Sequence, residues 1–97
     1  MHIISAKKLR QFWNVHKDVE QDLKEWYAKT EHMDWVAPED IKQKHKSASF
    51  LANNRVIFNI KGNRYRLVVQ VNYKNKVVYI RFIGTHSEYD RIDAEKI

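Results

Sequence analysis

Hydrophobic and polar residues alternate with a period of two in the second half of the chain, as is typical of half-buried β-strands. The alternation covers residues 55–60, 64–73 and 77–83. Gly62-Asn63 and Asn75-Lys76 separate these runs, and both dipeptides suit two-residue hairpin turns. The pattern therefore predicts a three-stranded antiparallel meander with one apolar face.

The first half of the chain has a helical period instead. Apolar residues recur three or four positions apart over residues 6–30, which predicts one or two amphipathic helices. Ser5 suits the N-cap of the first helix. Trp13 and Trp26 fall on the apolar side, so we expect both in the core rather than in contact with a ligand.

Three shorter segments complete the predicted fold. Residues 1–4 suit a short strand and residues 30–37 a loop, while Pro38 suits the first turn of a helix that ends near His45. We expect residues 1–97 to form a single domain of the α+β class. In it, the N-terminal helices pack on one face of a small antiparallel β-sheet.

The two predicted turns determine which residues lie opposite each other. The first turn pairs Asn59 with Arg66, whereas the second pairs Gln70 with Arg81 and Arg66 with Thr85. These pairings keep one face apolar, since a slip of one residue at either turn would move arginines into it. The other face carries the polar residues Arg55, Asn59, Arg64, Arg66, Gln70, Asn72, Tyr79 and Arg81.

Basic residues are concentrated in this predicted sheet. All twelve carboxylates lie outside residues 41–87, whereas ten of the eighteen Lys and Arg residues lie inside that stretch. A one-sided positive field suits a polyanion such as nucleic acid; a basic surface kept only for solubility is the alternative. Arginine, amide and tyrosine side chains on one face favour RNA, because they combine phosphate contacts with base stacking.

The composition also excludes several kinds of chemistry. There is no cysteine, hence no disulfide, no thiolate zinc site and no cysteine nucleophile. The N-terminus lacks the apolar segment of a signal peptide, and no run approaches the roughly 18 apolar residues of a membrane span. We therefore expect a cytoplasmic protein that enters no membrane and uses no cofactor.

Three residues around the end of the last predicted strand could support cleavage of a phosphodiester. His86 carries an imidazole, a group that suits proton transfer. Arg66 could stabilise charge on the phosphate, and Tyr89 could stack on a base or donate a proton. A polar strand edge with a satisfied histidine is the alternative. His86, Glu88 and Asp90 would converge on a metal only along an extended strand, so we expect no metal site.

Three stretches of the sequence are familiar. They are FNIKGNRYRLVV at residues 58–69, YIRFIGTH at residues 79–86 and EYD at residues 88–90. Together they resemble the HigB-type toxins of the RelE superfamily. The resemblance implies a RelE-like α+β fold and ribosome-dependent cleavage of translated mRNA that leaves a 2′,3′-cyclic phosphate. It also implies neutralisation by a HigA-type antitoxin encoded alongside.

The same resemblance implies roles for individual residues. Arg66 matches the arginine that contacts the scissile phosphate, and His86 falls where many relatives place a catalytic His or Arg. Tyr89 is a looser match for a C-terminal tyrosine that directly adjoins the histidine in several relatives, because Ser87 and Glu88 intervene here. No lysine matches the general-base lysines of some members. We expect Arg66, His86 and Tyr89 to be catalytic. We expect Arg55, Asn59, Lys61, Arg64 and Arg81 to bind RNA.

Two other functions stay open. One is a catalytically silent RNA- or ribosome-binding module, because no acidic general base lies on the basic face. The other is a subunit that acts mainly in co-repression, since the antitoxins of such pairs usually bind DNA. Sequence-specific DNA binding by this chain itself is not expected, because no basic recognition helix is evident.

Overall fold

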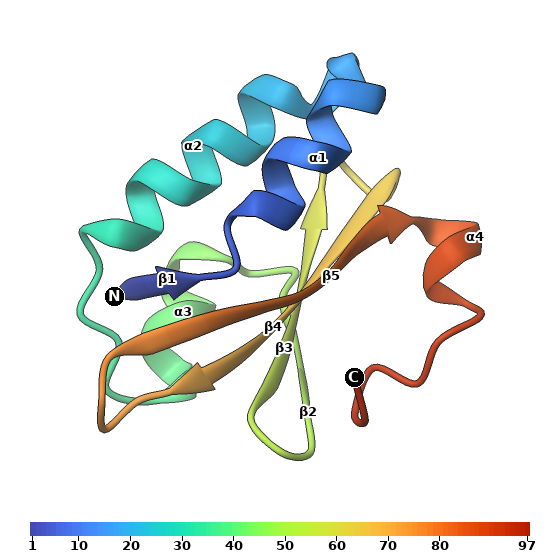
Figure 1. The fold of residues 1–97 in the computed structure, drawn as a ribbon. Helices are drawn as coiled ribbons and strands as arrows, with labels where there is room; N and C mark the ends of the chain where they lie inside the picture. Colours follow the sequence, from blue (N-terminus) through green and yellow to red (C-terminus); the bar gives the residue numbers. More distant parts are fainter.

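The fold is a twisted sheet with three helices on one side and a short C-terminal helix on the other (Figure 1). The computed structural model describes residues 1–97. The five strands stand in the order β1-β5-β4-β3-β2, and the α+β class is confirmed. The strands are β1 (His2–Ile4), β2 (Ser49–Leu51), β3 (Arg55–Ile60), β4 (Tyr65–Asn72) and β5 (Val77–Thr85).

The N-terminal helical region contains two α-helices, α1 (Lys7–Val15) and α2 (Glu20–Glu31), joined by a 3-10 turn. Ser5 has a left-handed backbone with φ of 69°, and α1 has no side-chain cap. The predicted Ser5 cap is therefore wrong. Helix α3 (Pro38–Lys44) begins at the predicted proline, where the Asp40 carboxylate accepts two backbone hydrogen bonds.

The sheet is mixed rather than wholly antiparallel. Strands β3, β4 and β5 form the predicted antiparallel meander. Strand β1, which was predicted, adds parallel to β5 at one edge. Strand β2 adds antiparallel to β3 at the other edge. It was not predicted, because Ser49–Leu51 shows no alternation of buried and exposed residues.

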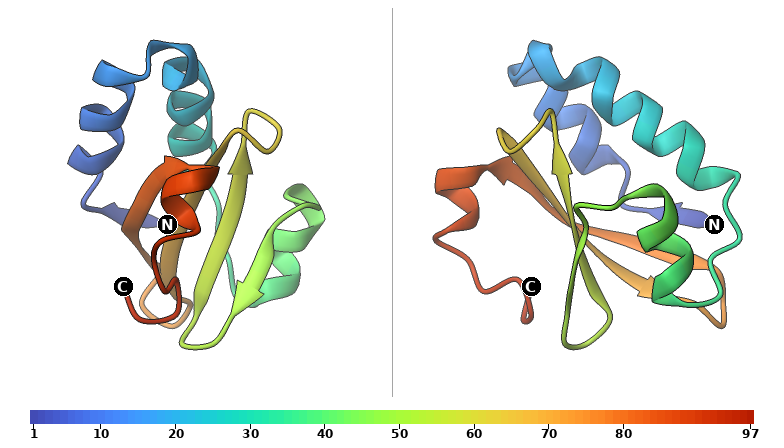
Figure 2. Two further views of the ribbon diagram at one scale, coloured as in Figure 1. Left: turned by 90° about the vertical axis from the view of Figure 1, so that its right-hand side faces the viewer. Right: turned by 180° about the vertical axis from the view of Figure 1, so that it is seen from behind.

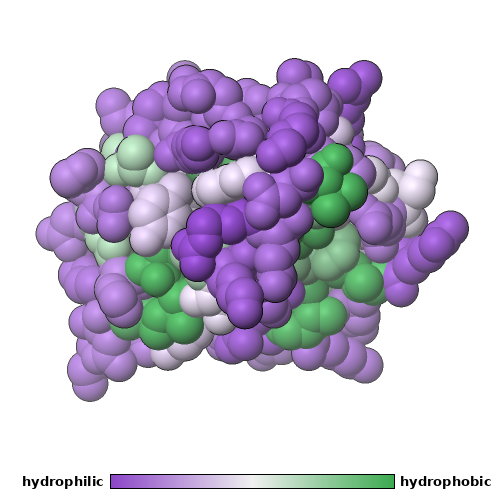
Figure 3. Space-filling model, turned by 45° about the horizontal axis from the view of Figure 1, so that its top comes forward, coloured by the Kyte–Doolittle hydropathy of each residue, from purple (hydrophilic) through white to green (hydrophobic).

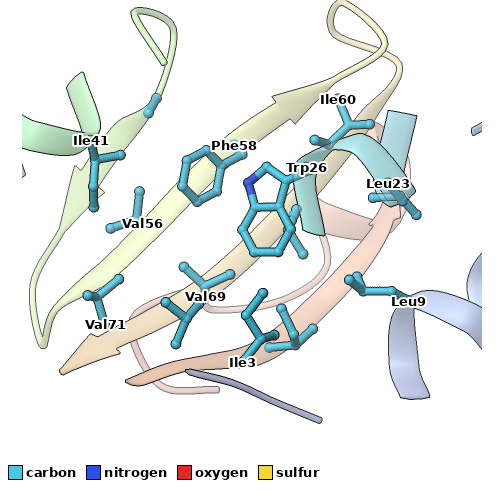
Figure 4. Packing of buried hydrophobic residues seen from close by; sticks show 14 of the residues in the cluster. Ile3, Leu9, Leu23, Trp26, Ile41, Val56, Phe58, Ile60, Val69 and Val71 are labelled. Carbon is cyan, nitrogen blue, oxygen red and sulfur yellow. The ribbon is translucent and has the colours of Figure 1, made fainter. Parts of the chain in front are cut away.

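A cluster of 17 buried residues lies between the sheet and helices α1, α2 and α3 (Figure 4). Trp26 of α2 packs edge-on against Phe58 of β3, with ring centroids 5.4 Å apart. Trp35, from the loop before α3, stacks on the same ring. Trp26 lies in the core as predicted, whereas Trp13 is half-buried at its margin. Aromatic side chains of this size dominate the burial that holds helices and sheet together.

The two hairpins differ in how well the sequence predicted them. The first has the predicted register, since Asn59 lies opposite Arg66. In the second, Asn72 pairs with Val77, so the loop contains four residues instead of two. The Asn72 side chain closes this loop by accepting a hydrogen bond from the backbone N–H of Asn75 at 2.9 Å.

The longer loop changes the pairing of β4 with β5. Gln70 lies opposite Tyr79, so the predicted pairing of Gln70 with Arg81 is wrong. Farther along, Arg66 lies opposite Gly84 instead of Thr85. The predicted partner of Gln70 is wrong by two residues and that of Arg66 by one, because the register of β4 with β5 also shifts between these two pairs.

That shift is a β-bulge in β5 at Arg81, the residue left without a partner. The alternation of β5 changes sides there. Phe82 joins a small second cluster on the face away from the helices, and Ile83 packs against the main core. The sequence pattern had placed Phe82 on the helix-covered face. That prediction is wrong. Phe82 and Ile83 are both apolar, so the sequence pattern does not show that the alternation changes sides at Arg81.

The face away from the helices is partly covered by the segment that follows the last helix, α4 (His86–Tyr89) (Figure 2). Beneath this segment Ile57 and Val68 are buried. Arg55 is only 8% exposed, and its guanidinium donates to the carbonyl of Ile97. The expectation that Arg55 faces an open RNA-binding surface is therefore wrong, because alternation along a strand does not reveal what covers it.

The surface over α1 and α2 is mostly hydrophilic, with separate hydrophobic areas between the charged side chains (Figure 3). Val15 and Val36 are among the exposed large hydrophobic residues. None of the helices has the length and apolar character needed to cross a membrane.

Candidate active site

Arg66, near the start of β4, lies against both of the other residues predicted to be catalytic. Its guanidinium lies over the Tyr89 ring, 4.7 Å from the centroid, a favourable cation–π geometry. Its Nη2 atom lies 3.2 Å from Nε2 of His86. The fold therefore gathers Arg66, His86 and Tyr89 into one cluster on the face away from the helices.

Helix α4 holds two of these side chains in place because it begins with a capping box. The hydroxyl of Thr85 accepts a hydrogen bond from the Glu88 backbone at 3.2 Å, and the Glu88 carboxylate accepts one from the Thr85 backbone at 2.8 Å. The hydrogen bond from the Thr85 backbone is the main reason that the pKa of Glu88 lies below its ordinary value. This cap fixes the position at which His86 leaves the strand.

His86 is held from both sides of its ring. Its Nδ1 lies 3.2 Å from the Asp90 carboxylate, while Nε2 faces Arg66. A carboxylate accepts a hydrogen bond and a guanidinium only donates. Both contacts fit the tautomer that carries its proton on Nδ1 and uses the Nε2 electron pair to accept from Arg66. In that form, and with Arg66 turned to another partner, Nε2 can accept a proton from a hydroxyl.

The backbone feature that places His86 beside Arg66 differs from the one predicted. Strict alternation along residues 77–86 predicts that His86 points toward the helices, so on that pattern its place beside Arg66 requires the strand to end near Gly84. Instead β5 continues to Thr85. The bulge at Arg81 reverses the alternation before the strand ends. Gly84, which lies opposite Arg66, therefore faces away from the helices, and so does His86 two positions later.

Arg81 lies farther along the same face and is tightly oriented. Its Nε and Nη2 atoms donate to the side-chain oxygen of Gln70 at 3.2 and 2.6 Å. Its guanidinium also lies over the ring of Tyr79, 5.1 Å from the centroid. A stacked, hydrogen-bonded arginine loses little entropy when it binds a phosphate or a base.

The other residues predicted to bind RNA lie around the first hairpin. Lys61 and Arg64 contact Asp18, beside the helices: Lys61 donates to its carbonyl at 2.9 Å and Arg64 to its carboxylate at 3.1 Å. Asn59 donates to the backbone of Ser47 at 3.2 Å. The Arg64 side chain nevertheless remains 62% exposed, so it is accessible to a polyanion.

The acidic residues near His86 do not converge with it. Glu88 and Asp90 lie on a single helical turn, and the Glu88 carboxylate is occupied by the Thr85 backbone. No group of three or more His, Cys, Asp or Glu side chains in the chain could hold a metal ion.

Residues 19–92 match a family model described as HigB toxin, the RelE-like toxic component of a toxin-antitoxin system. This chain belongs to the HigB family of RelE-like toxins. The matched region contains all three residues of the cluster, and the predicted family is confirmed.

Two curated relatives illustrate how far the likeness extends. The mRNA interferase toxin HigB of Escherichia coli strain K12 is 28% identical over 102 aligned positions, which cover 97% of this chain and 92% of the relative. The mRNA interferase HigB of Escherichia coli O6:H1 is 24% identical over 94 positions, covering 95% and 91%. The chain therefore aligns with these HigB proteins over nearly its whole length.

Within this HigB-family fold, the cluster combines a guanidinium, an imidazole and a phenol. Sequence reasoning missed the contribution of Asp90, which had been considered only as a metal ligand. A signal was present: an acid four residues after a histidine lies beside it on a helical turn. The segment 86–89 had not been predicted as a helix, so that spacing was not used.

Proposed function

We propose that this protein cleaves messenger RNA during translation, as the toxic component of a toxin–antitoxin pair. Family membership supports the toxin role, and the printed names of its relatives, mRNA interferases, support mRNA as the substrate. One observation carries the catalytic part of the proposal. Arg66 contacts both His86 and Tyr89, although 20 or more positions separate it from them in the chain.

The proposed reaction is an attack by the ribose 2′-hydroxyl on the adjacent phosphorus. His86 Nε2 takes the proton of that hydroxyl, and Arg66 stabilises the charge that develops on the phosphate oxygens. The bond from phosphorus to the 5′-oxygen then breaks. Tyr89 supplies a proton to the leaving oxygen and regains one from water. The products are a 2′,3′-cyclic phosphate and a 5′-hydroxyl.

We further propose that the ribosome completes the site. In the free protein Arg66 is engaged with His86, and the Asp90 carboxylate is paired with His86 Nδ1, so the cluster offers no free second general base. A translating ribosome holds the message in a fixed path, and such positioning alone removes a large part of the barrier to an intramolecular attack. On this proposal, RNA outside the ribosome is a poor substrate.

The partner that neutralises the toxin is proposed to be a HigA-type antitoxin encoded next to it. Family membership supports an antitoxin as such. A neighbouring short reading frame that encodes a helix-turn-helix protein would support the HigA type. If that protein, expressed together with this chain, leaves toxicity unchanged, another kind of antitoxin is required.

Cleavage itself is tested by inducing this chain alone in growing bacteria and mapping new 5′ ends on translated messages. We expect growth arrest and cuts inside reading frames. A matched message without a start codon should stay intact. If no new ends appear although the protein binds ribosomes, it is a silent ribosome-binding module. Efficient cutting of purified RNA would remove the ribosome from the mechanism.

A further inference from the structure

A polar hollow lies on the same face as Arg66, toward the far end of β4. Its volume is about 500 Å³, within the range of small-ligand pockets. No acidic residue lines it. The lining residues that carry polar side-chain groups are Asn54, Gln70, Asn72, Tyr73, Lys74, Tyr79 and Arg81. The proposed catalytic cluster uses none of them.

The two ordered amides of this hollow have their oxygens already occupied. Gln70 accepts from Arg81 through its side-chain oxygen, and Asn72 accepts from the backbone of Asn75 through its own. Both partners can only donate, so the orientation of each amide is determined. Each amide therefore retains a free NH2 group, and Arg81 and Lys74 add further donors. The hollow offers donors and needs a ligand rich in acceptors.

Of the two purines, guanine fits this requirement. Its major-groove edge carries two adjacent acceptors, O6 and N7, and arginine is their most frequent partner. Adenine presents one acceptor and one donor on the same edge, so it would leave a donor facing a donor. The ring of Tyr79, already stacked under Arg81, adds an aromatic surface beside the base.

We propose that this hollow binds a guanine of the RNA substrate at a fixed position near the cleavage site, an inference that rests on the proposed function. Arg66 and Gln70 lie on the same face of β4, four residues and roughly 13 Å apart. The C-terminal segment covers Ile57 of β3 and Val68 of β4, and Val68 lies between Arg66 and Gln70 on this face. A short single strand would therefore run from one site to the other along β5, where Phe82 is only partly buried.

The substitution Gln70→Glu tests this proposal without removing the anchor of Arg81. The glutamate keeps an oxygen for Arg81 but replaces the free NH2 group with an acceptor. Asn72→Asp makes the same exchange while keeping its bond to Asn75. The control variant is Gln11→Glu. It introduces the same change in charge at an exposed residue of helix α1, on the opposite side of the molecule. Melting temperatures identify any variant that fails to fold.

Cleavage is measured on translated reporter messages in which each nucleotide around one cut site is varied. We expect wild type to prefer guanine over adenine at one fixed position by about 10-fold, the scale of one good base contact. Gln70→Glu and Asn72→Asp should abolish most of that preference, and Gln11→Glu should keep it. A wild type without base preference, or a preference unchanged in Gln70→Glu, overturns the proposal. So does a Gln70→Glu variant that slows all sequences equally, because the contact is then with phosphate.

A binding measurement separates this proposal from the proposed function. Guanosine 5′-monophosphate and adenosine 5′-monophosphate are titrated into the labelled protein, and the side-chain amide signals of Gln70 and Asn72 are followed by NMR. We expect guanylate to shift them several-fold more than adenylate at equal concentration. Equal shifts overturn the proposal in favour of a phosphate site. This result stands whether or not the protein cuts RNA.

Discussion

The Nη2 atom of Arg66 lies 3.2 Å from Nε2 of His86, so the proposed phosphate-binding cation and the proposed proton acceptor contact each other. Because a guanidinium cannot accept a hydrogen bond, the contact requires an unprotonated Nε2. An RNA phosphate would compete for Arg66 and leave Nε2 free. The free protein thus holds both groups in place, in a contact that substrate binding has to open.

Replacing Arg66 with alanine should abolish toxicity while preserving the fold. The side chain is half-buried on the face away from the core, so its loss leaves no core cavity and should change stability by no more than about 1 kcal/mol. Loss of a charge contact to the transition state typically lowers a rate about 10²–10³-fold. Single-turnover cleavage on programmed ribosomes and urea unfolding measure the two effects.

The variant Arg66→Lys is the matched control for charge. A lysine keeps the positive charge but cannot bind a phosphate through two parallel hydrogen bonds or stack flat on Tyr89. We expect it to recover only part of the lost rate. An Arg66→Ala protein as toxic as wild type at equal expression would refute the assignment of the site.

The β-sheet shows where sequence patterns predict structure and where they do not. Gly62-Asn63 fixed the first hairpin, because alternation on both sides of that turn agrees with a single register. The second hairpin depended on the side chain of Asn72, which closes a longer loop. The bulge at Arg81 left no trace in the pattern, because apolar residues follow it on both faces.

The candidate site was predicted better than its supporting contacts. A register argument and a family motif brought Arg66 and His86 together, and the structure places them in contact. The capping of α4 by Thr85 and the packing of the C-terminal segment depend on long-range contacts that no local pattern encodes. That is why Arg55, which belongs to the alternating polar set, turned out to be buried.

The buried position of Arg55 predicts that it contributes to stability rather than to RNA affinity. Its guanidinium donates to the backbone carbonyls of Asn53 and Ile97. Arg55→Ala would leave both carbonyls without that donor and should cost about 1–3 kcal/mol in the free energy of unfolding. Ribosome binding should change less than 2-fold, whereas Arg81→Ala should weaken it without comparable destabilisation.

Urea unfolding and ribosome co-sedimentation give the two quantities for Arg55→Ala. The reverse pattern, with normal stability and much weaker binding, would return Arg55 to the RNA-binding surface. It would also mean that the C-terminal segment does not cover Ile57 and Val68 in solution.

Asp18 ties the junction of α1 and α2 to the first hairpin, and it makes stability depend on acid pH. Its carboxylate accepts hydrogen bonds from the Tyr65 hydroxyl at 2.8 Å and from Arg64 at 3.1 Å. The bond from Tyr65 is the main reason that the pKa of Asp18 lies below its ordinary value of 3.8. A lowered pKa means that the unfolded chain binds this proton more tightly than the folded protein does. The stabilisation is therefore complete above that ordinary value and is lost as the pH falls through the folded one.

Asp18→Asn should consequently lower the melting temperature at pH 7, and the difference from wild type should shrink below about pH 4. Tyr65→Phe keeps the packed ring and removes the hydroxyl, so it should reduce the same pH-dependent part. Melting curves from pH 2 to pH 7 provide the test. Parallel curves for wild type and both variants would show that the carboxylate makes no such contribution.

His86 is the residue whose proposed role in proton transfer most needs a separate test from its role in structure. If Nε2 accepts the proton of the 2′-hydroxyl, His86→Gln should lower the rate of the cleavage step by about 10²-fold or more. Ribosome binding should survive, since affinity rests mainly on the many Lys and Arg contacts. Asp90→Asn is the matched variant, because it removes the carboxylate that holds the proton on Nδ1.

Asp90→Asn should lower the same rate less than His86→Gln does, because the imidazole remains but its tautomer is no longer selected. It should also change the pH dependence of the cleavage rate, which a merely structural residue would not do. Pre-steady-state cleavage and melting temperature are measured on the same preparations of both variants. A histidine that only stabilises the end of β5 predicts the opposite result, a lower melting temperature with a nearly normal cleavage rate. A stable, ribosome-bound and fully active His86→Gln protein would move the proton transfer to Tyr89 or to the ribosome.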